Sequence, residues 1–250
     1  MIRAAAVGDV HFAADSAGRL RPHLEAEADR IDLLLLAGDL TRRGDPREAE
    51  VLAEELRDLG CPIVAVLGNH DFHLGAERTV AQVMESAGVR VLEGAAVTVA
   101  AKGLSVGVAG VKGFGGGFAG ACATDFGEPE MRAFVAATRR SAEALKKALT
   151  PLEADVKIAL LHYSPVEGTL VGETVGLWPF LGSYMLAEAV DRAGADLVLH
   201  GHAHSGCAQA ATAGGVPVLN VAQPVIRRPF ALLELGKAGL RSEAARTGTR

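Results

Sequence analysis

The amino-acid sequence predicts an α/β fold, and two observations support this. Over the first 90 residues, short apolar segments alternate with longer amphipathic segments, which is the pattern of β-α-β units with parallel strands. After Val89 the apolar segments follow one another closely with glycines between them, which indicates an antiparallel stretch. We therefore expect parallel and antiparallel strands together in one α/β domain.

The parallel part contains three expected strands and two expected helices. The strands lie at residues 2–8, 32–38 and 62–68, where the chain is almost entirely apolar. The first helix is expected at 48–59, because Asp45 can cap it, Pro46 suits its first turn and Gly60 can end it. The second is expected at 76–87, where apolar residues recur on one face and Gly88 follows.

The rest of the chain supplies more strands, two helices and two irregular segments. Strands are expected at 91, 95–101, 104–111, 156–161, 196–199, 216–221 and 230–235, and helices at 131–149 and 184–193. The segments 113–120, rich in glycine, and 164–182, with Gly, Pro and aromatic residues, are expected to be functional or mobile. We expect one domain over 1–238 and a frayed polar tail over 239–250.

The charge balance argues against some classes of partner. A net charge of −5 and a pI near 5.9 do not provide the basic face that an extended nucleic-acid surface or an anionic membrane requires. A phosphate-bearing substrate stays compatible, because bound divalent metals would supply positive charge locally. Three scattered cysteines, and the lack of an apolar signal or membrane segment, lead us to expect a cytoplasmic protein.

Side chains that can bind metal follow five of the expected strands. They are Asp9 and His11, then Asp39, then Asn69 with His70 and Asp71, then His162, and finally His200, His202 and His204. Strand ends in an α/β sheet converge on one rim, and burying so many unpaired polar groups would be costly without a metal. Oxygen and imidazole ligands without a thiolate cluster suit Mn, Fe, Zn or similar ions. The sequence therefore predicts a metal site.

In this order, Asp-x-His, Gly-Asp, Gly-Asn-His-Asp, His and Gly-His-x-His resemble the calcineurin-like metallophosphoesterase superfamily over residues 9–204. The resemblance implies two mixed β-sheets packed as a sandwich between helices, in four layers α/β/β/α. It also implies two divalent metal ions that share Asp39 as a bridging ligand. The further ligands would be Asp9, His11 and His204 for the first ion, and Asn69, His162 and His202 for the second. His70 would face the substrate phosphate as a catalytic residue, with Asp71 orienting its ring.

The function expected from this resemblance is hydrolysis of a phosphoester. Two neighbouring ions can clamp a phosphoryl group and activate a bound water as the nucleophile, while His70 stabilises charge or protonates the leaving group. The Gly-Asn-His-Asp motif resembles small bacterial class III phosphodiesterases of the cyclic-nucleotide type, so we favour a phosphodiesterase acting on a small substrate such as a nucleotide. Two alternative functions stay open: a phosphomonoesterase or nucleotidase, and a non-catalytic scaffold. The oligomeric state also stays open, with a homodimer as one option.

Several other residues have alternative interpretations. His200 is expected to support a ligand rather than bind metal. Arg42 and Arg43 follow Asp39 closely enough to meet a phosphate, although a solvated loop is favoured. Backbone amides of the glycine-rich segment are equally compatible with substrate contact and with a flexible connection. Aromatic residues in and beside the second segment could stack on a base, but hydrophobic packing is favoured.

Overall fold

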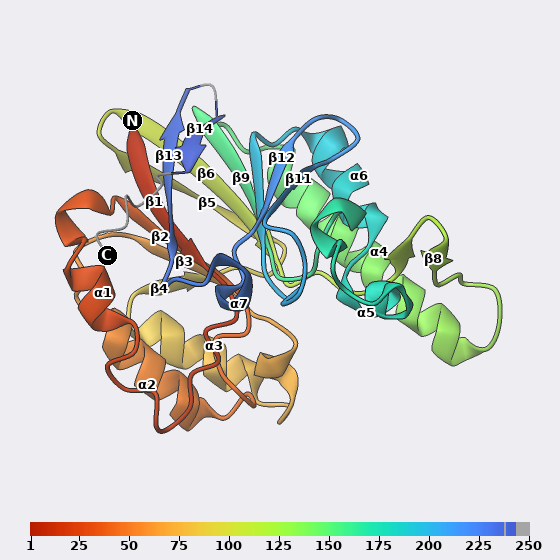
Figure 1. Ribbon diagram of the computed structural model, residues 1–250, viewed down its shortest axis with the longest axis horizontal. Coiled ribbons are helices and arrows are strands. Elements are labelled where there is room, and N and C mark those ends of the chain that lie inside the picture. The colour runs from red at the N-terminus through yellow and green to blue at the C-terminus, as the bar shows by residue number, and fades with distance from the viewer. Residues whose placement is uncertain (238, 244–250) are drawn as a thin grey trace.

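The computed structural model describes residues 1–237 and 239–243, which form two six-stranded sheets flanked by helices (Figure 1). In the first sheet, β1, β2, β3 and β4 run parallel to one another. At one edge, β13 pairs antiparallel with β1, and β14 pairs antiparallel with β13. Its order is β14 (Gly239–Glu243), β13 (Ala231–Gly236), β1 (Ile2–Val7), β2 (Leu33–Ala37), β3 (Ile63–Val66) and β4 (Val89–Val91). The predicted parallel β-α-β arrangement is confirmed.

The second sheet is also mixed. Its four inner strands run parallel, and the strand at each edge is antiparallel to its neighbour. Its order is β11 (Gln209–Ala211), β12 (Pro217–Asn220), β10 (Leu197–His200), β9 (Val156–Leu161), β6 (Leu104–Val111) and β5 (Ala95–Ala101). A small hairpin, β7 (Gly117–Phe118) and β8 (Ala121–Cys122), stands apart from both sheets.

Helices cover the outer faces of both sheets (Figure 1). The first sheet is covered by α1 (Arg21–Glu25), α2 (Pro46–Leu56) and α3 (Glu77–Ser86), and the second by α4 (Pro129–Leu149) and α6 (Tyr184–Ala193). Short helices α5 (Trp178–Leu181) and α7 (Gln223–Ile226) lie in connections, with 3-10 turns at Ala28–Arg30, His70–Phe72, Glu167–Leu170 and Val175–Leu177.

The alternation of side chains along each strand builds the layers. In β1, Ala4 and Ala6 join the core between the two sheets, whereas Ala5 and Val7 pack in the core beneath the helices of the first sheet. In β9, Ile158 likewise faces the other sheet, while the outer face of that strand packs against α4 and α6. The predicted sandwich with four layers is therefore confirmed.

The structure differs from the prediction at some boundaries. Residues 239–243, expected to belong to a frayed tail, form β14 and pair with β13, and the remainder of that tail lies outside the described residues. Helix α2 begins at Pro46, capped by the Asp45 side chain, and ends at Leu56 rather than at residue 59. It ends early because Arg57 has an extended ψ of 134° and Asp58 a left-handed φ of 56°.

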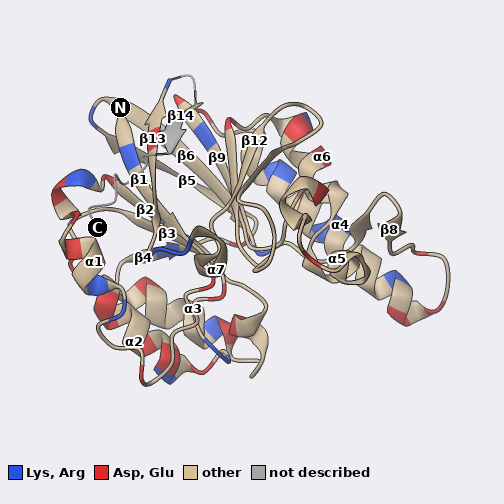
Figure 2. Ribbon diagram, viewed as in Figure 1, with Lys and Arg blue, Asp and Glu red and all other residues tan. Residues whose placement is uncertain are grey.

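Charged side chains of both signs are interspersed along the outer helices (Figure 2). Several form ion pairs within or next to a helix, including Arg192 with Glu188 at 2.9 Å and Lys146 with Glu143 at 3.7 Å. Exposed pairs of this kind contribute little to stability, so the two apolar interfaces under the helices and the core between the sheets dominate it. Within the described ranges, none of the helices combines the length and apolarity needed to cross a membrane.

Candidate metal centre

The predicted ligands meet where strands of both sheets end together. Asp9, Asp39 and Asn69 follow β1, β2 and β3 of the first sheet, whereas His162 and His202 follow β9 and β10 of the second. Backbone hydrogen bonds join these loops: Asp9 N donates to Gly38 O at 2.9 Å and Gly201 N donates to His162 O at 3.1 Å. The site therefore lies at a common edge of two sheets rather than at the rim of one.

The first predicted group is assembled around Asp9. Ligand atoms of Asp9, His11 and His204 all lie within 4.8 Å of one another, and His204 Nε2 is 2.8 Å from Asp9 Oδ1. His11 also approaches the second carboxylate, with its Nε2 3.7 Å from Asp39 Oδ2. One ion could thus be reached by two carboxylates and two imidazoles.

The second predicted group is assembled around Asp39. Ligand atoms of Asp39, His162 and His202 lie within 4.8 Å of one another. His162 Nε2 is 3.3 Å from Asp39 Oδ1 and 2.9 Å from Asn69 Oδ1, which adds the amide oxygen to the group. Because Asp39 points one carboxylate oxygen at His162 and the other at His11, its position suits a ligand shared by two ions.

Hydrogen bonds fix two of the rings so that one nitrogen faces the centre. His162 Nδ1 lies 2.9 Å from Ala37 O, and His202 Nε2 lies 3.1 Å from Phe180 O. A carbonyl oxygen can only accept, so each of these nitrogens carries the proton. The opposite nitrogen, Nε2 of His162 and Nδ1 of His202, keeps its lone pair for a metal. Such outer partners typically set the tautomer of a ligating histidine.

Four of the ligands have a left-handed backbone, which non-glycine residues seldom adopt. Their φ values are 59° for Asp9, 43° for His11, 49° for Asp39 and 70° for His202. Each such residue costs roughly 1–3 kcal/mol where the surroundings hold it, and such strain is concentrated at functional sites. Asp58, Lys102 and Arg227 are the other non-glycine residues of this kind in the described chain. The strain therefore falls mainly on the predicted ligands.

Two glycines allow the ligand loops to approach closely. A Cβ on Gly68 would collide with the backbone nitrogen and carboxylate of Asp39, and one on Gly201 would collide with the carboxylate of Asp9. Both glycines directly precede a ligand segment and approach a ligand that follows a different strand. Their presence in the Gly-Asn-His-Asp and Gly-His-x-His motifs thus has a steric reason.

The electrostatics of the centre suit a cation. Burial and the nearby His162 lower the pKa of His202 to about 3, and burial also lowers the pKa of His11. Burial alone would raise the pKa of Asp9, but His204, His162 and the His202 amide outweigh it and lower that pKa. These shifts favour the ionised form of Asp9 and the neutral forms of His11 and His202, which are the forms that bind divalent metal ions, whereas the hydrogen bond to Asp9 raises the pKa of His204.

His70 reaches the centre, but its ring is not held as predicted. Its Nδ1 donates to Arg42 O at 2.8 Å, and its Nε2 lies 3.9 Å from Asp39 Oδ2. The prediction that Asp71 orients this ring is wrong. The buried Asp71 carboxylate instead accepts hydrogen bonds from Leu40 N, Thr41 N, Thr41 Oγ1 and Gly68 N, at 2.6 to 3.1 Å. It joins the loops after β2 and β3, and burial raises its pKa.

His200 and the connection after β9 support the centre from outside, as expected for His200. Both of its ring nitrogens have partners, Gly201 O at 2.7 Å and Thr169 Oγ1 at 2.9 Å, and burial lowers its pKa to about 4. Thr169 in turn bonds Ser164 Oγ at 2.8 Å. The segment 164–182 is therefore ordered by short helical turns and by contacts to His200 and His202.

The glycine-rich segment 113–120 packs against that connection. Gly116 N donates to Pro179 O at 2.7 Å and Gly117 N donates to Gly182 O at 2.8 Å. These amides are thus engaged within the protein rather than offered to a substrate. Close packing against α5 explains the glycines here, because a Cβ on Gly115 would meet Pro179 O.

Sequence reasoning missed one residue at this edge, Lys112. It directly follows β6, as the ligands follow their strands, and its carbonyl accepts from His162 N at 3.0 Å and Tyr163 N at 3.1 Å. Burial lowers the pKa of Lys112, whereas the charges of Glu93 and Asp39 act in the opposite direction. Its position after a strand was the available signal, but lysine is not a usual metal ligand.

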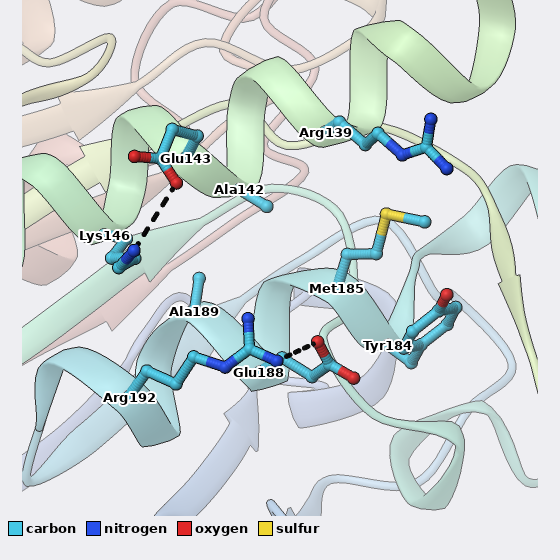
Figure 3. A pocket seen from close by; sticks show the side chains of 9 residues that line it. All are labelled: Arg139, Ala142, Glu143, Lys146, Tyr184, Met185, Glu188, Ala189 and Arg192. Carbon is cyan, nitrogen blue, oxygen red and sulfur yellow. Dashed lines mark hydrogen bonds and ion pairs between the residues drawn. The ribbon is translucent and has the colours of Figure 1, made fainter. Parts of the chain in front are cut away.

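Cavities are also found outside the ligand cluster. One, of about 520 Å³, is lined by Ala13, Asp15, Arg42 and Arg43 and borders the loop that holds the His70 ring. Another, of about 410 Å³, lies between α4 and α6 (Figure 3). Of its three cations, Lys146 and Arg192 pair with Glu143 and Glu188, and Arg139 pairs with Asp125. Of these two cavities, the one beside Arg42 adjoins the site.

The chain matches a known protein family over most of its length. Residues 2–206 match the family described as calcineurin-like phosphoesterase. A probable cyclic nucleotide phosphodiesterase of Synechococcus sp. is 38% identical over 77 residues, which cover 27% of this chain and 30% of that protein. The match thus spans under a third of the curated relative.

Solved structures share the fold. A phosphopantetheinyl hydrolase of Mycobacterium tuberculosis has a TM-score of 0.59 at 15% identity, covering 90% of both chains. A putative 5′-nucleotidase of Staphylococcus aureus has a TM-score of 0.59 at 19% identity, covering 97% of this chain and 53% of that one. A hypothetical protein of Thermus thermophilus has a TM-score of 0.58 at 18% identity, covering 97% of both chains.

Proposed function

The chain belongs to the calcineurin-like phosphoesterase family, and on that basis we propose that it is a phosphodiesterase that depends on two divalent metal ions. The observation that carries the proposal is the shared position of Asp39, whose two carboxylate oxygens face the two predicted ligand groups. The partial similarity to a probable cyclic nucleotide phosphodiesterase supports the choice of a diester, and of a small nucleotide as its substrate. We propose Mn, Fe, Zn or similar divalent ions as the metals.

The residues would divide the work as follows. Asp9, His11, Asp39 and His204 would hold one ion, and Asp39, Asn69, His162 and His202 the other. Bound there, two ions would supply positive charge to the phosphoryl oxygens and lower the pKa of a coordinated water. Asp71 would keep the loops carrying Asp39 and Asn69 in register through its four hydrogen bonds.

We propose that His70 acts on the substrate. Its Nδ1 proton is committed to Arg42 O, which leaves Nε2 as the nitrogen that faces the centre. A protonated Nε2 could donate to a phosphoryl oxygen or to the departing alkoxide, as a general acid does. His70 Nε2 also lies within ligand range of His11 and Asp39, so its role needs a test that separates binding of metal from turnover.

The cavity beside Arg42 suits the leaving group. Its lining residue Arg42 accepts the hydrogen bond from the His70 ring through its carbonyl. Arg42 and Arg43 line it together with the carboxylates of Asp15, Asp45 and Glu48, and Arg42 Nη2 lies 3.6 Å from Asp15 Oδ1. An exposed pair at this distance is weak and could be opened by an anionic ligand. We propose that this cavity receives the part of the substrate beyond the scissile bond.

The test compares hydrolysis of bis-p-nitrophenyl phosphate and p-nitrophenyl phosphate by protein stripped of metal and resupplied with Mn²⁺. We expect Mn²⁺ to restore diester hydrolysis, and Asp39→Asn to abolish it. His70→Ala should lower kcat by about 10²-fold or more while metal content stays unchanged. A preference for the monoester would indicate a phosphatase or nucleotidase. A protein that binds metal but hydrolyses neither ester would contradict the proposal.

A further inference from the structure

Lys112 differs from the other lysines in its surroundings. Its ammonium nitrogen lies 4.9 Å from the ring centroid of Phe72, 5.0 Å from that of Phe114 and 5.3 Å from that of Tyr163. A cation over an aromatic face is stabilised by the ring quadrupole, and desolvation strengthens this interaction. The three rings therefore hold the charged end of a half-buried side chain in one place.

Two of the three rings come from loops that carry predicted metal ligands, whereas Phe114 lies in the segment that follows Lys112 itself. Phe72 follows Asn69 and His70 after β3, and Tyr163 directly follows His162 after β9. Tyr163 also packs on His202, with ring centroids 4.4 Å apart. The cage thus places Lys112 beside the second predicted ligand group, on the same edge of the sandwich.

Among the described residues, the Lys112 ammonium has no anionic partner of its own. In the part of the chain that the structure describes, no carboxylate oxygen lies within 4.0 Å of Lys112 Nζ, and Nζ donates no hydrogen bond. The nearby Glu93 is engaged by the Lys112 backbone amide, with its Oε2 2.9 Å away. Its N–H donors are therefore available to an acceptor that arrives from elsewhere.

We propose that Lys112 is a substrate-binding residue that donates to a non-bridging oxygen of the phosphoryl group held at the metal centre. This inference rests on the proposed phosphoesterase function. Packing alone is the competing explanation, because cation–π contacts also stabilise folds. Packing alone, however, gives no reason for a cation beside the centre whose donors are unused. The phosphate class of ligand follows from the position, next to ligands suited to two divalent ions.

The experiment measures binding of inorganic phosphate by calorimetry to the Mn²⁺-loaded protein, together with KM and kcat for the model esters. Lys112→Met keeps the length and apolar stem of the side chain and packs well against aromatic rings. We expect it to weaken phosphate binding and to raise KM roughly tenfold or more, because a hydrogen bond to a charged group is lost. Lys112→Arg should recover part of the loss. Lys146→Met, at the distant groove between α4 and α6 (Figure 3), is the control.

The outcomes separate the inference from the proposed function. If Lys112→Met has the phosphate affinity and KM of the wild type, the role of Lys112 is overturned. It is also overturned if the variant loses phosphate affinity only together with bound metal or with thermal stability. A wild-type protein that does not bind phosphate would overturn it as well. If the wild type binds phosphate through Lys112 but hydrolyses neither ester, the proposed function fails while the binding role stands.

Discussion

Asp39 is the residue on which the centre depends most. Its side chain is buried, its Oδ1 accepts from His70 N at 2.8 Å, and its backbone is held at a φ of 49°. Gly68, in the next loop, packs so closely that a Cβ there would collide with the same oxygen. Contacts within the protein therefore hold the carboxylate in place, which reduces the cost of ordering the site.

Gly68→Ala tests this placement. The added Cβ would collide with the backbone and carboxylate of Asp39, so that loop must shift. We expect a loss of about 1–3 kcal/mol in the free energy of unfolding, typical of overpacking, and a larger relative loss of metal affinity. Urea unfolding and metal titration measure the two effects. Gly176→Ala is the control, because a Cβ there meets no atom within 4 Å. Equal behaviour of the two variants would show that Asp39 is not confined by Gly68.

At this scale the sequence predicted which candidate ligands lie together, but not the residues that support them. Asp9, Asp39 and His162 could be found because a metal-binding side chain directly after a buried strand is uncommon, and because this pattern can be recognised from neighbouring residues alone. The partners of Asp71 could not, because they depend on how the loops after β2 and β3 meet in space. Lys112 was missed for the same reason, since its cage is built from three separate loops.

At the scale of elements, a carboxylate on α2 fixes the segment that leads into α1. Glu55 is buried, and its oxygens accept from Gly18 N at 2.5 Å, Leu20 N at 2.9 Å and Arg21 N at 2.7 Å. Burial alone would raise the pKa of Glu55, but these hydrogen bonds outweigh it and lower that pKa. Short α1 thus depends on α2, which explains why its own sequence gave little indication of it.

Glu55→Gln should destabilise the protein by about 1–3 kcal/mol at neutral pH, because an amide cannot accept from all three backbone groups. The pKa of Glu55 is lower in the folded than in the unfolded state. Its stabilising effect is therefore full above the unfolded value near 4.5 and is lost as pH falls through the folded value. The difference between wild type and variant should shrink in acid. Urea unfolding of metal-free protein at several pH values measures it, with exposed Glu50→Gln as control. A difference independent of pH would refute this account.

At the scale of the whole molecule, the centre joins the two sheets. Asp9 and Asp39 come from the first sheet, whereas His162, His202 and His204 come from the second. The local pattern predicted the strands, but it could not show that β13 returns beside β1 or that the ligands are divided between two sheets, because both depend on distant pairings. Ions bound at this junction would stabilise only the folded state. At a hundredfold excess over Kd, each would contribute about 2.7 kcal/mol, or roughly 5–10 °C in Tm for a chain of this size.

The most direct test of a centre for two ions is calorimetric titration of the metal-free protein with Mn²⁺, with Tm followed in parallel. We predict two equivalents per chain for the wild type and a rise in Tm on binding. Loss of His204 or of Asn69 should remove one equivalent each, and Asp39→Asn should weaken both. A wild type that binds a single ion, or in which Asp39→Asn retains both equivalents at unchanged affinity, would contradict a centre bridged by Asp39.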